Sequence, residues 1–267
     1  MITIISAWYN EEFLAPLFLN HYSFADRIII MLDESTNDNT ILEIRDCIDV
    51  ANYMISVRRL NMPDGLDDQL KQKQVNNQYG QIKEGWVIEV DADEFIKIPE
   101  IGMKPFLNEI KEDVVEVMFW QMYQNQQVEK SLDNHTPVFE QRQHGIRNRF
   151  KRWNKPCAVR AGRNYAWSVG HHEIVPSRNI SDKMLLGAHL SMADSGMAVA
   201  RRIFGHKNRQ SQANYQNKLS VHNHHVTEEE IIHKCDSYKN CPPVVWAETF
   251  GEQEDNYYKL MKKKGLI

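Results

Sequence analysis

Two carboxylates, Asp91 and Asp93, stand directly after the mostly apolar segment 86–90. This segment predicts a buried strand, which would deliver both side chains to one edge of a sheet. Hard oxygen donors of this kind suit Mg²⁺ or Mn²⁺, and such an ion keeps coordination positions open for phosphate oxygens. We therefore predict a divalent-metal site at Asp91 and Asp93, with a solvated turn or helix cap as the alternative.

Polar residues also follow two earlier strand-like segments. Tyr9, Asn10 and Glu11 come after the apolar segment 2–7, and the segment 27–33 ends on Asp33. Carboxyl ends of parallel strands meet at one edge of a sheet, where ligands bind in open α/β folds. The three strand ends are thus expected to converge on one acidic crevice. The alternatives are local: Asn10 as a helix cap and Asp33 as a turn residue.

The elements that must position these residues follow a regular order in the first part of the chain. Strand-like and helix-like segments alternate through about residue 95, which predicts an α/β fold with a mostly parallel central sheet flanked by helices. Beyond residue 100 the pattern changes to α+β. There we expect strands over 114–123, 157–160, 165–169 and 184–190, and helices over about 194–204 and 228–238.

Three motifs, Ala7–Glu11, Asp33–Thr40 and Val90–Phe95, together resemble the family-2-type glycosyltransferases of the GT-A (Rossmann-like) fold. The third is similar to the branch in which Asp-x-Asp-Glu-Phe replaces Asp-Asp-Asp. The resemblance implies one continuous domain, with a nucleotide-sugar-binding half over 1–100 and an acceptor-binding, C-terminal helical half over 101–267. It also implies a nucleotide-sugar donor, a UDP-sugar in the first place, a Mn²⁺ or Mg²⁺ cofactor, and a glycan or lipid-linked saccharide as acceptor.

Carried over by position, the resemblance assigns roles to individual residues. Asp93 would be the principal metal ligand and a catalytic residue, Asp91 would touch ribose and metal, and His189 would complete the metal shell. The implied donor contacts are Tyr9, Asn10, Glu11 and Asp33 around the nucleotide, and Lys73 and Asn76 near the phosphates. The alternatives are a satisfied core histidine for His189 and a solvated lysine for Lys73.

A catalytic base is sought in the cluster Gly170–Glu173, which combines two imidazoles with a carboxylate. Glu173 is the candidate, because a carboxylate near a metal and a basic wall can accept the proton of an attacking hydroxyl. The alternative is a surface turn with partly buried histidines. Glu112 and Asp113 form an acidic pair of the kind that supplies this base in many related enzymes, but their place before the strand 114–123 favours a turn.

The segment between Gln141 and His172 has no acidic residue and eight basic ones. Guanidinium groups pair with diphosphates in a bidentate way, so Arg149, Arg152 and Arg163 are candidates for holding the donor. A second interpretation is a polyanion- or RNA-binding surface that combines these charges with aromatic residues. The third is a solvated basic face that balances acidity elsewhere.

Composition limits the remaining choices. Lys and Arg number 32 and Asp and Glu number 36, so the formal charge of −4 predicts no general attraction to nucleic acid. We find no apolar run long enough to cross a bilayer and no secretory signal, and expect a cytoplasmic enzyme, with peripheral membrane contact through Lys262–Lys264 as an option. The predicted reaction is metal-dependent, inverting sugar transfer. The alternatives are a nucleotidyltransferase, although residues 7–10 lack its glycine-rich phosphate loop, and a non-enzymatic polyanion-binding module using residues 141–172.

Overall fold

The computed structural model describes residues 1–147, 154–177, 179–244 and 246. The strands in this part of the chain are β1 (Ile2–Trp8), β2 (Arg27–Asp33), β3 (Met54–Leu60), β4 (Trp86–Glu89), β5 (Glu94–Ile96), β6 (Val114–Met122), β7 (Gly145–Ile146), β8 (Asn154–Arg160), β9 (Ala166–Trp167), β10 (Ile174–Val175) and β11 (Leu185–His189). The main sheet has the order β3-β2-β1-β4-β8-β6-β11-β5, and β7 pairs with β6. A separate antiparallel pair joins β9 to β10.

The main sheet is mostly parallel, as the sequence predicts. The strands β1 to β4 run parallel to one another, and β6 and β11 also form a parallel pair. The strand β8 lies antiparallel between β4 and β6, so β6 and β11 run in the same direction as β4. Antiparallel β5 closes the far edge beside β11. One sheet thus combines strands from both parts of the chain.

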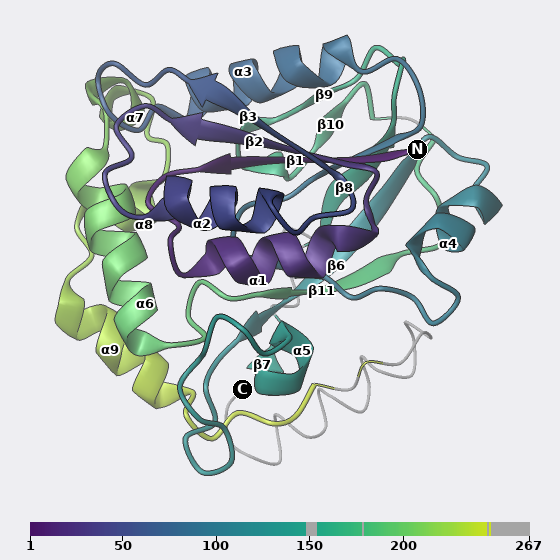
Figure 1. Cartoon of the computed structure of the whole chain (residues 1–267). Coiled ribbons are helices and arrows are strands. Elements are labelled where there is room, and N and C mark those ends of the chain that lie inside the picture. Colours follow the sequence, from purple (N-terminus) through teal and green to yellow (C-terminus); the bar gives the residue numbers. More distant parts are fainter. Residues whose placement is uncertain (148–153, 178, 245, 247–267) are drawn as a thin grey trace.

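The helices flank this sheet on both faces and extend beyond one of its ends (Figure 1). Their bounds are α1 (Leu14–His21), α2 (Thr40–Ile48), α3 (Asp68–Gln81), α4 (Met103–Glu109), α5 (Val138–Gln141), α6 (Ser195–Val199), α7 (Gln212–Gln216), α8 (Val221–His224) and α9 (Glu228–Ser237). Shorter helical turns are η1 (Tyr22–Phe24), η3 (Val169–His171) and η5 (Lys207–Arg209), and η4 (Ala200–His206) is a π-helix. The helices α6 to α8 stand beside the end toward which β1 and β2 point.

The hydrophobic core divides into two layers because side chains alternate between the faces of a strand. Ile4, Ile28 and Ile30 pack with the α1 residues Leu17 and Phe18 on one face. On the other face, Ile5 and Ile29 of the same strands pack with Val75 and Tyr79 of α3. Burial on both faces explains the unbroken aliphatic runs from which these strands were predicted.

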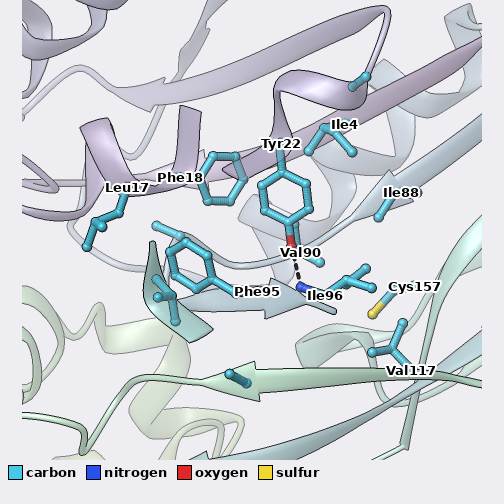
Figure 2. Packing of buried hydrophobic residues seen from close by; sticks show 14 of the residues in the cluster. Ile4, Leu17, Phe18, Tyr22, Ile88, Val90, Phe95, Ile96, Val117 and Cys157 are labelled. Carbon is cyan, nitrogen blue, oxygen red and sulfur yellow. Dashed lines mark hydrogen bonds between the residues drawn. The ribbon is translucent and has the colours of Figure 1, made fainter. Parts of the chain in front are cut away.

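A buried aromatic cluster ties the start of the chain to β5 (Figure 2). The Tyr22 hydroxyl donates a hydrogen bond to the Glu94 carbonyl at 2.8 Å and accepts one from the Ile96 backbone N–H at 3.1 Å. The ring of Phe18 packs against Tyr22 with a centroid distance of 4.5 Å. This cluster anchors β5 directly after the segment that carries Asp91 and Asp93.

Three features of the fold differ from the sequence predictions: the role of Asn10, one strand and one helix. Asn10 does not cap a helix: its φ of 52° is left-handed, and α1 begins only at Leu14. The strand expected over 165–169 is limited to β9, because η3 follows it directly. The helix expected over about 194–204 is α6 followed by the π-helix η4. The expected helix over 228–238 is confirmed as α9, with its capping box at Thr227 and Glu230.

Candidate functional site

A cleft of about 1140 Å³ opens at the carboxyl ends of β1, β2 and β4. Because these strands are parallel, their ends bring together residues that are far apart in the sequence. Seven of the predicted site residues line this cleft: Tyr9, Asn10, Glu11, Asp33, Asp91, Asp93 and His189. Further lining residues come from the segment 194–209, which follows β11 and begins with α6, placed in Figure 1 beside the end toward which β1 and β2 point.

Asp93 lies buried at the base of the cleft, with 4% of its surface exposed. Its Oδ2 atom is 3.4 Å from His189 Nε2 and 3.3 Å from Arg201 Nη2. Burial alone would raise the pKa of Asp93, but the charges of Arg201 and His189 outweigh it and hold that pKa well below its ordinary value. Asp93 is therefore an anion at neutral pH and is available as a ligand for a cation.

Asp91 faces two lysines. Its carboxylate oxygens lie 3.6 Å from Lys71 Nζ and 3.5 Å from Lys155 Nζ. Burial would raise the pKa of Asp91, but Lys71 and Lys155 lower it well below the usual range. Lys155 also donates a hydrogen bond to the buried carboxylate of Glu94 at 2.5 Å. Burial would lower the pKa of Lys155, but Glu94 and Asp91 raise it, so this lysine stays protonated.

Glu11 forms an ion pair with Arg201 of the π-helix η4. The backbone N–H of Glu11 donates to Thr40 Oγ1 at 2.7 Å, which fixes the loop after β1 against the start of α2. Burial raises the pKa of Glu11 to about 7, although Arg201 opposes the shift. Arg201 thus links two strand ends, since its guanidinium contacts both Glu11 and Asp93.

Asp33 and Tyr9 are joined by Arg209. The Arg209 Nη2 atom donates to Asp33 Oδ2 at 2.5 Å and to Ser35 Oγ at 3.1 Å. Its guanidinium carbon lies 3.3 Å from the centroid of the Tyr9 ring, in a cation–π contact. The backbone holds this arginine in place, because the Leu66 N–H donates to the Arg209 carbonyl at 2.6 Å.

The residues at the base of the cleft have the chemistry of a partial metal site. Asp93 offers a hard carboxylate oxygen and His189 an imidazole nitrogen beside it, which together fit Mn²⁺ or Mg²⁺ with further oxygens from a ligand. Asp91 points toward its two lysines instead. In the part of the chain that the structure describes, no group of three or more His, Cys, Asp or Glu side chains is arranged to hold a metal ion.

Other predicted site residues lie elsewhere. Lys73 and Asn76 line a separate hollow of about 360 Å³ between α3 and residues 167–169, and Asn76 is hydrogen-bonded to the backbone of Trp167. Glu173 is exposed and does not line the cleft. Arg163 pairs with Asp113 at 3.3 Å, also outside the cleft. Arg149 and Arg152 are outside the described residues.

The basic segment 141–172 does not act as one surface where the structure describes it. Arg142 is fully buried, Lys155 lies in the cleft, and the Arg160 guanidinium stacks on the Trp86 ring at 4.5 Å. These side chains serve different parts of the fold. Other lysine and arginine side chains that line the cleft come from outside this segment: Lys71, Arg201, Arg202, Arg209, Lys218 and Lys234. The basic segment itself supplies Lys155 to the lining.

No protein-family model matches the chain, and no curated protein matches it in sequence. Solved structures that resemble it include HddC from Yersinia pseudotuberculosis, at 12% identity and a TM-score of 0.30 over 60% of this chain and 73% of that chain. Another is glucosyl-3-phosphoglycerate synthase from Mycobacterium tuberculosis in complex with Mn²⁺, UDP and phosphoglyceric acid, at 12% identity and a TM-score of 0.28 over 45% and 43%. The nucleoside-diphosphate-sugar pyrophosphorylase from Vibrio cholerae has 14% identity and a TM-score of 0.26 over 46% and 57%. Likeness at these scores assigns no activity to this chain.

None of the helices in the described ranges combines the length and apolar character that crossing a membrane requires. The lysines at 262–264, the predicted membrane contact, lie outside these ranges.

Proposed function

We propose that this protein is a GT-A-type glycosyltransferase that moves a sugar from a nucleoside-diphosphate sugar to a hydroxyl group of a glycan or lipid-linked acceptor. The observation that carries the proposal is the cleft itself, where three parallel strand ends present Asp33, Asp91 and Asp93 in a lining that also holds seven lysine and arginine side chains. Acidic residues suit a metal and a ribose, while lysine and arginine suit a diphosphate. Residues 1–100 would supply most of the donor site, and residues 101–267 the acceptor side.

The residues of the cleft divide into three roles in this proposal. Asp93 and His189 would hold a divalent metal, which when bound would neutralise charge on the leaving nucleoside diphosphate. Asp33 and Tyr9 receive the nucleoside, because they lie together at the ends of β1 and β2. Lys71, Lys155 and Arg201 border the same base of the cleft and stabilise the diphosphate as its charge develops.

The acceptor hydroxyl displaces the nucleoside diphosphate from the anomeric carbon, and direct displacement inverts the configuration of the sugar. This step requires a base that removes the hydroxyl proton. Glu173 is not proposed for it, because its exposed side chain lies outside the lining of the cleft. The base is to be sought among carboxylates that do line the cleft on the side of the C-terminal part, such as Asp194.

The proposal is tested by incubating the protein with a panel of sugar nucleotides and Mn²⁺ and measuring the released nucleotide. We expect nucleoside diphosphate to appear only with metal, and Asp93→Asn to lower the rate about 100-fold or more. Asp64→Asn, an exposed carboxylate outside the cleft, is the matched control and should keep the wild-type rate.

Three results would contradict the proposal in different ways. An unchanged rate in Asp93→Asn would remove the metal assignment. Release of pyrophosphate from a nucleoside triphosphate and a sugar phosphate would instead identify a nucleotidyltransferase. Salt-dependent retention of a polyanion without any turnover of sugar nucleotides would support the binding module.

A further inference from the structure

We propose that Arg201 pairs with Asp93 when no metal is bound, so that a divalent metal and Arg201 compete for Asp93. The diphosphate of the donor would favour metal binding, because it pairs with Arg201 in place of Asp93. The inference rests on the proposed function, since it assigns metal and diphosphate to this cleft. It adds a prediction of its own, namely that metal and nucleotide bind cooperatively.

The competition follows from the geometry around one oxygen atom. Arg201 Nη2 and His189 Nε2 both approach Asp93 Oδ2, at 3.3 Å and 3.4 Å. A metal held by Asp93 and His189 would lie between these two side chains. A guanidinium and a divalent cation cannot occupy the same coordination position, and their like charges repel at short range. Arg201 must therefore move away from Asp93 when a metal binds.

Arg201 also has an unused hydrogen-bond donor that could bind another anion. Its side chain is only 13% exposed, and its Nε atom is buried without a hydrogen-bond partner among the described residues. A guanidinium presents five donors in a planar fork that matches the oxygens of a phosphate group. The contacts with Glu11 and Asp93 leave part of this fork unused. A diphosphate in the cleft would offer the oxygens that the fork lacks.

Because of this exchange of partners, we expect the metal and the nucleoside diphosphate to bind weakly one at a time and strongly together. Metal alone has to displace Arg201 and leave its charge beside the ion. Nucleoside diphosphate alone meets the negative charge of Asp93 and Asp91. When both bind, the metal replaces Arg201 on Asp93 and the diphosphate receives Arg201. Thermodynamic linkage then requires each ligand to increase the affinity of the other by the same factor.

The test measures Mn²⁺ binding by isothermal titration calorimetry without nucleotide. In Arg201→Gln the affinity for Mn²⁺ should rise about tenfold, because the metal no longer has to break the hydrogen bond between Arg201 and Asp93. A tenfold change corresponds to the free energy of about one charge-assisted hydrogen bond. The matched control is Arg209→Gln, which removes the same charge from the same cleft but pairs with Asp33. Its affinity for Mn²⁺ should stay within about threefold of the wild-type value.

A second measurement uses UDP as the probe. In the wild-type protein, saturating Mn²⁺ should increase the affinity for UDP about tenfold or more, and in Arg201→Gln this coupling should fall to a few-fold. Arg201→Lys is the second variant, to be used where melting curves show that Arg201→Gln does not fold. Lysine keeps the charge without the fork, so a rise of about threefold in Mn²⁺ affinity is expected.

Asp93→Asn separates failure of this inference from failure of the proposed function. If Asp93→Asn abolishes Mn²⁺ binding but the arginine variants bind Mn²⁺ no more tightly than wild type, the competition is refuted and the metal site stands. If Asp93→Asn binds Mn²⁺ as well as wild type does, the metal assignment itself is wrong.

Discussion

Arg142 shows how differently single basic residues of one segment are used. Its side chain is fully buried, and its guanidinium donates to three backbone carbonyls, those of Ala193 at 2.9 Å, Lys130 at 2.8 Å and Gln141 at 2.9 Å. Arg142 therefore fastens the chain after β11 to the region before β7. Such a residue stabilises the fold and is not accessible to a polyanion.

We expect Arg142→Met to lower the free energy of unfolding by about 3–5 kcal/mol, because three backbone carbonyls, one of them in a fully buried hydrogen bond, lose their donor. Urea unfolding followed by circular dichroism measures the change. Arg163→Met is the matched control: Arg163 is 56% exposed and pairs with Asp113 on the surface, so its loss should cost about 1 kcal/mol or less. Equal effects of the two substitutions would show that the bonds of Arg142 contribute little.

Which lysine of α3 enters the cleft could not be read from the sequence. The resemblance assigned Lys73, whereas the structure places Lys71 against Asp91. Two residues along a helix rotate a side chain by about 200°, which exchanges the inner and the outer face. The buried positions of this helix include Asp68, Gln72 and Gln78, so polar residues lie on both faces and hydrophobic periodicity gives no orientation.

At the scale of the element, β11 depends on one glycine. A Cβ atom at Gly187 would lie 2.5 Å and 2.6 Å from two ring carbons of Phe119 on the neighbouring strand β6. The absence of a side chain lets the Phe119 ring lie across β11. Because His189 follows two residues later on the same strand, the position of this candidate metal ligand depends on the contact.

Gly187→Ala should therefore lower the free energy of unfolding by about 1–3 kcal/mol, since the Phe119 ring has to shift. Gly80→Ala, a matched change in the helix α3, should have the opposite sign and stabilise by up to about 1 kcal/mol, because a Cβ atom there meets nothing within 4 Å. Thermal unfolding of both variants measures the pair. A neutral Gly187→Ala would mean that β6 and β11 adjust without cost.

Elements with strong local signals were predictable, and elements defined by their neighbours were not. The aliphatic runs of β1, β2 and β6 identify these strands because burial on both faces demands them. The strand β5 is only three residues long and exists because it pairs with β11. No residue preference separates the π-helix η4 from an ordinary helical turn, so its wider winding was not foreseen.

At the scale of the whole molecule, the acidic side of the cleft was predictable and the basic side was not. Strand ends of a parallel sheet converge by a general rule, so Asp33, Asp91 and Asp93 could be placed together. Arg201 lies 190 residues from Glu11, and Arg209 lies 176 residues from Asp33. Contacts over such separations follow from the path of the C-terminal part across the cleft, which local periodicity does not encode.

The stability of the whole fold should depend on pH through His21, which lies where α1 meets β5. Its Nε2 atom is 2.8 Å from the Ile96 carbonyl, and burial lowers the pKa of His21 to about 4 from the ordinary 6.5. Between pH 6.5 and 4 the unfolded chain therefore binds a proton that the folded chain excludes, so stability falls as the pH decreases. Over this range His21 should contribute a loss of about 3 kcal/mol.

The contribution of His21 is isolated by comparing urea unfolding of the wild type and His21→Gln between pH 7 and pH 4. Glutamine does not titrate, so the free energy of unfolding of the wild type, measured relative to that of His21→Gln, should decrease by about 3 kcal/mol from pH 7 to pH 4. His233→Gln, which changes an exposed histidine on α9, should instead follow the wild-type curve. Parallel curves for His21→Gln and wild type would show that His21 accepts a proton inside the folded protein, and that the junction of α1 and β5 opens to water.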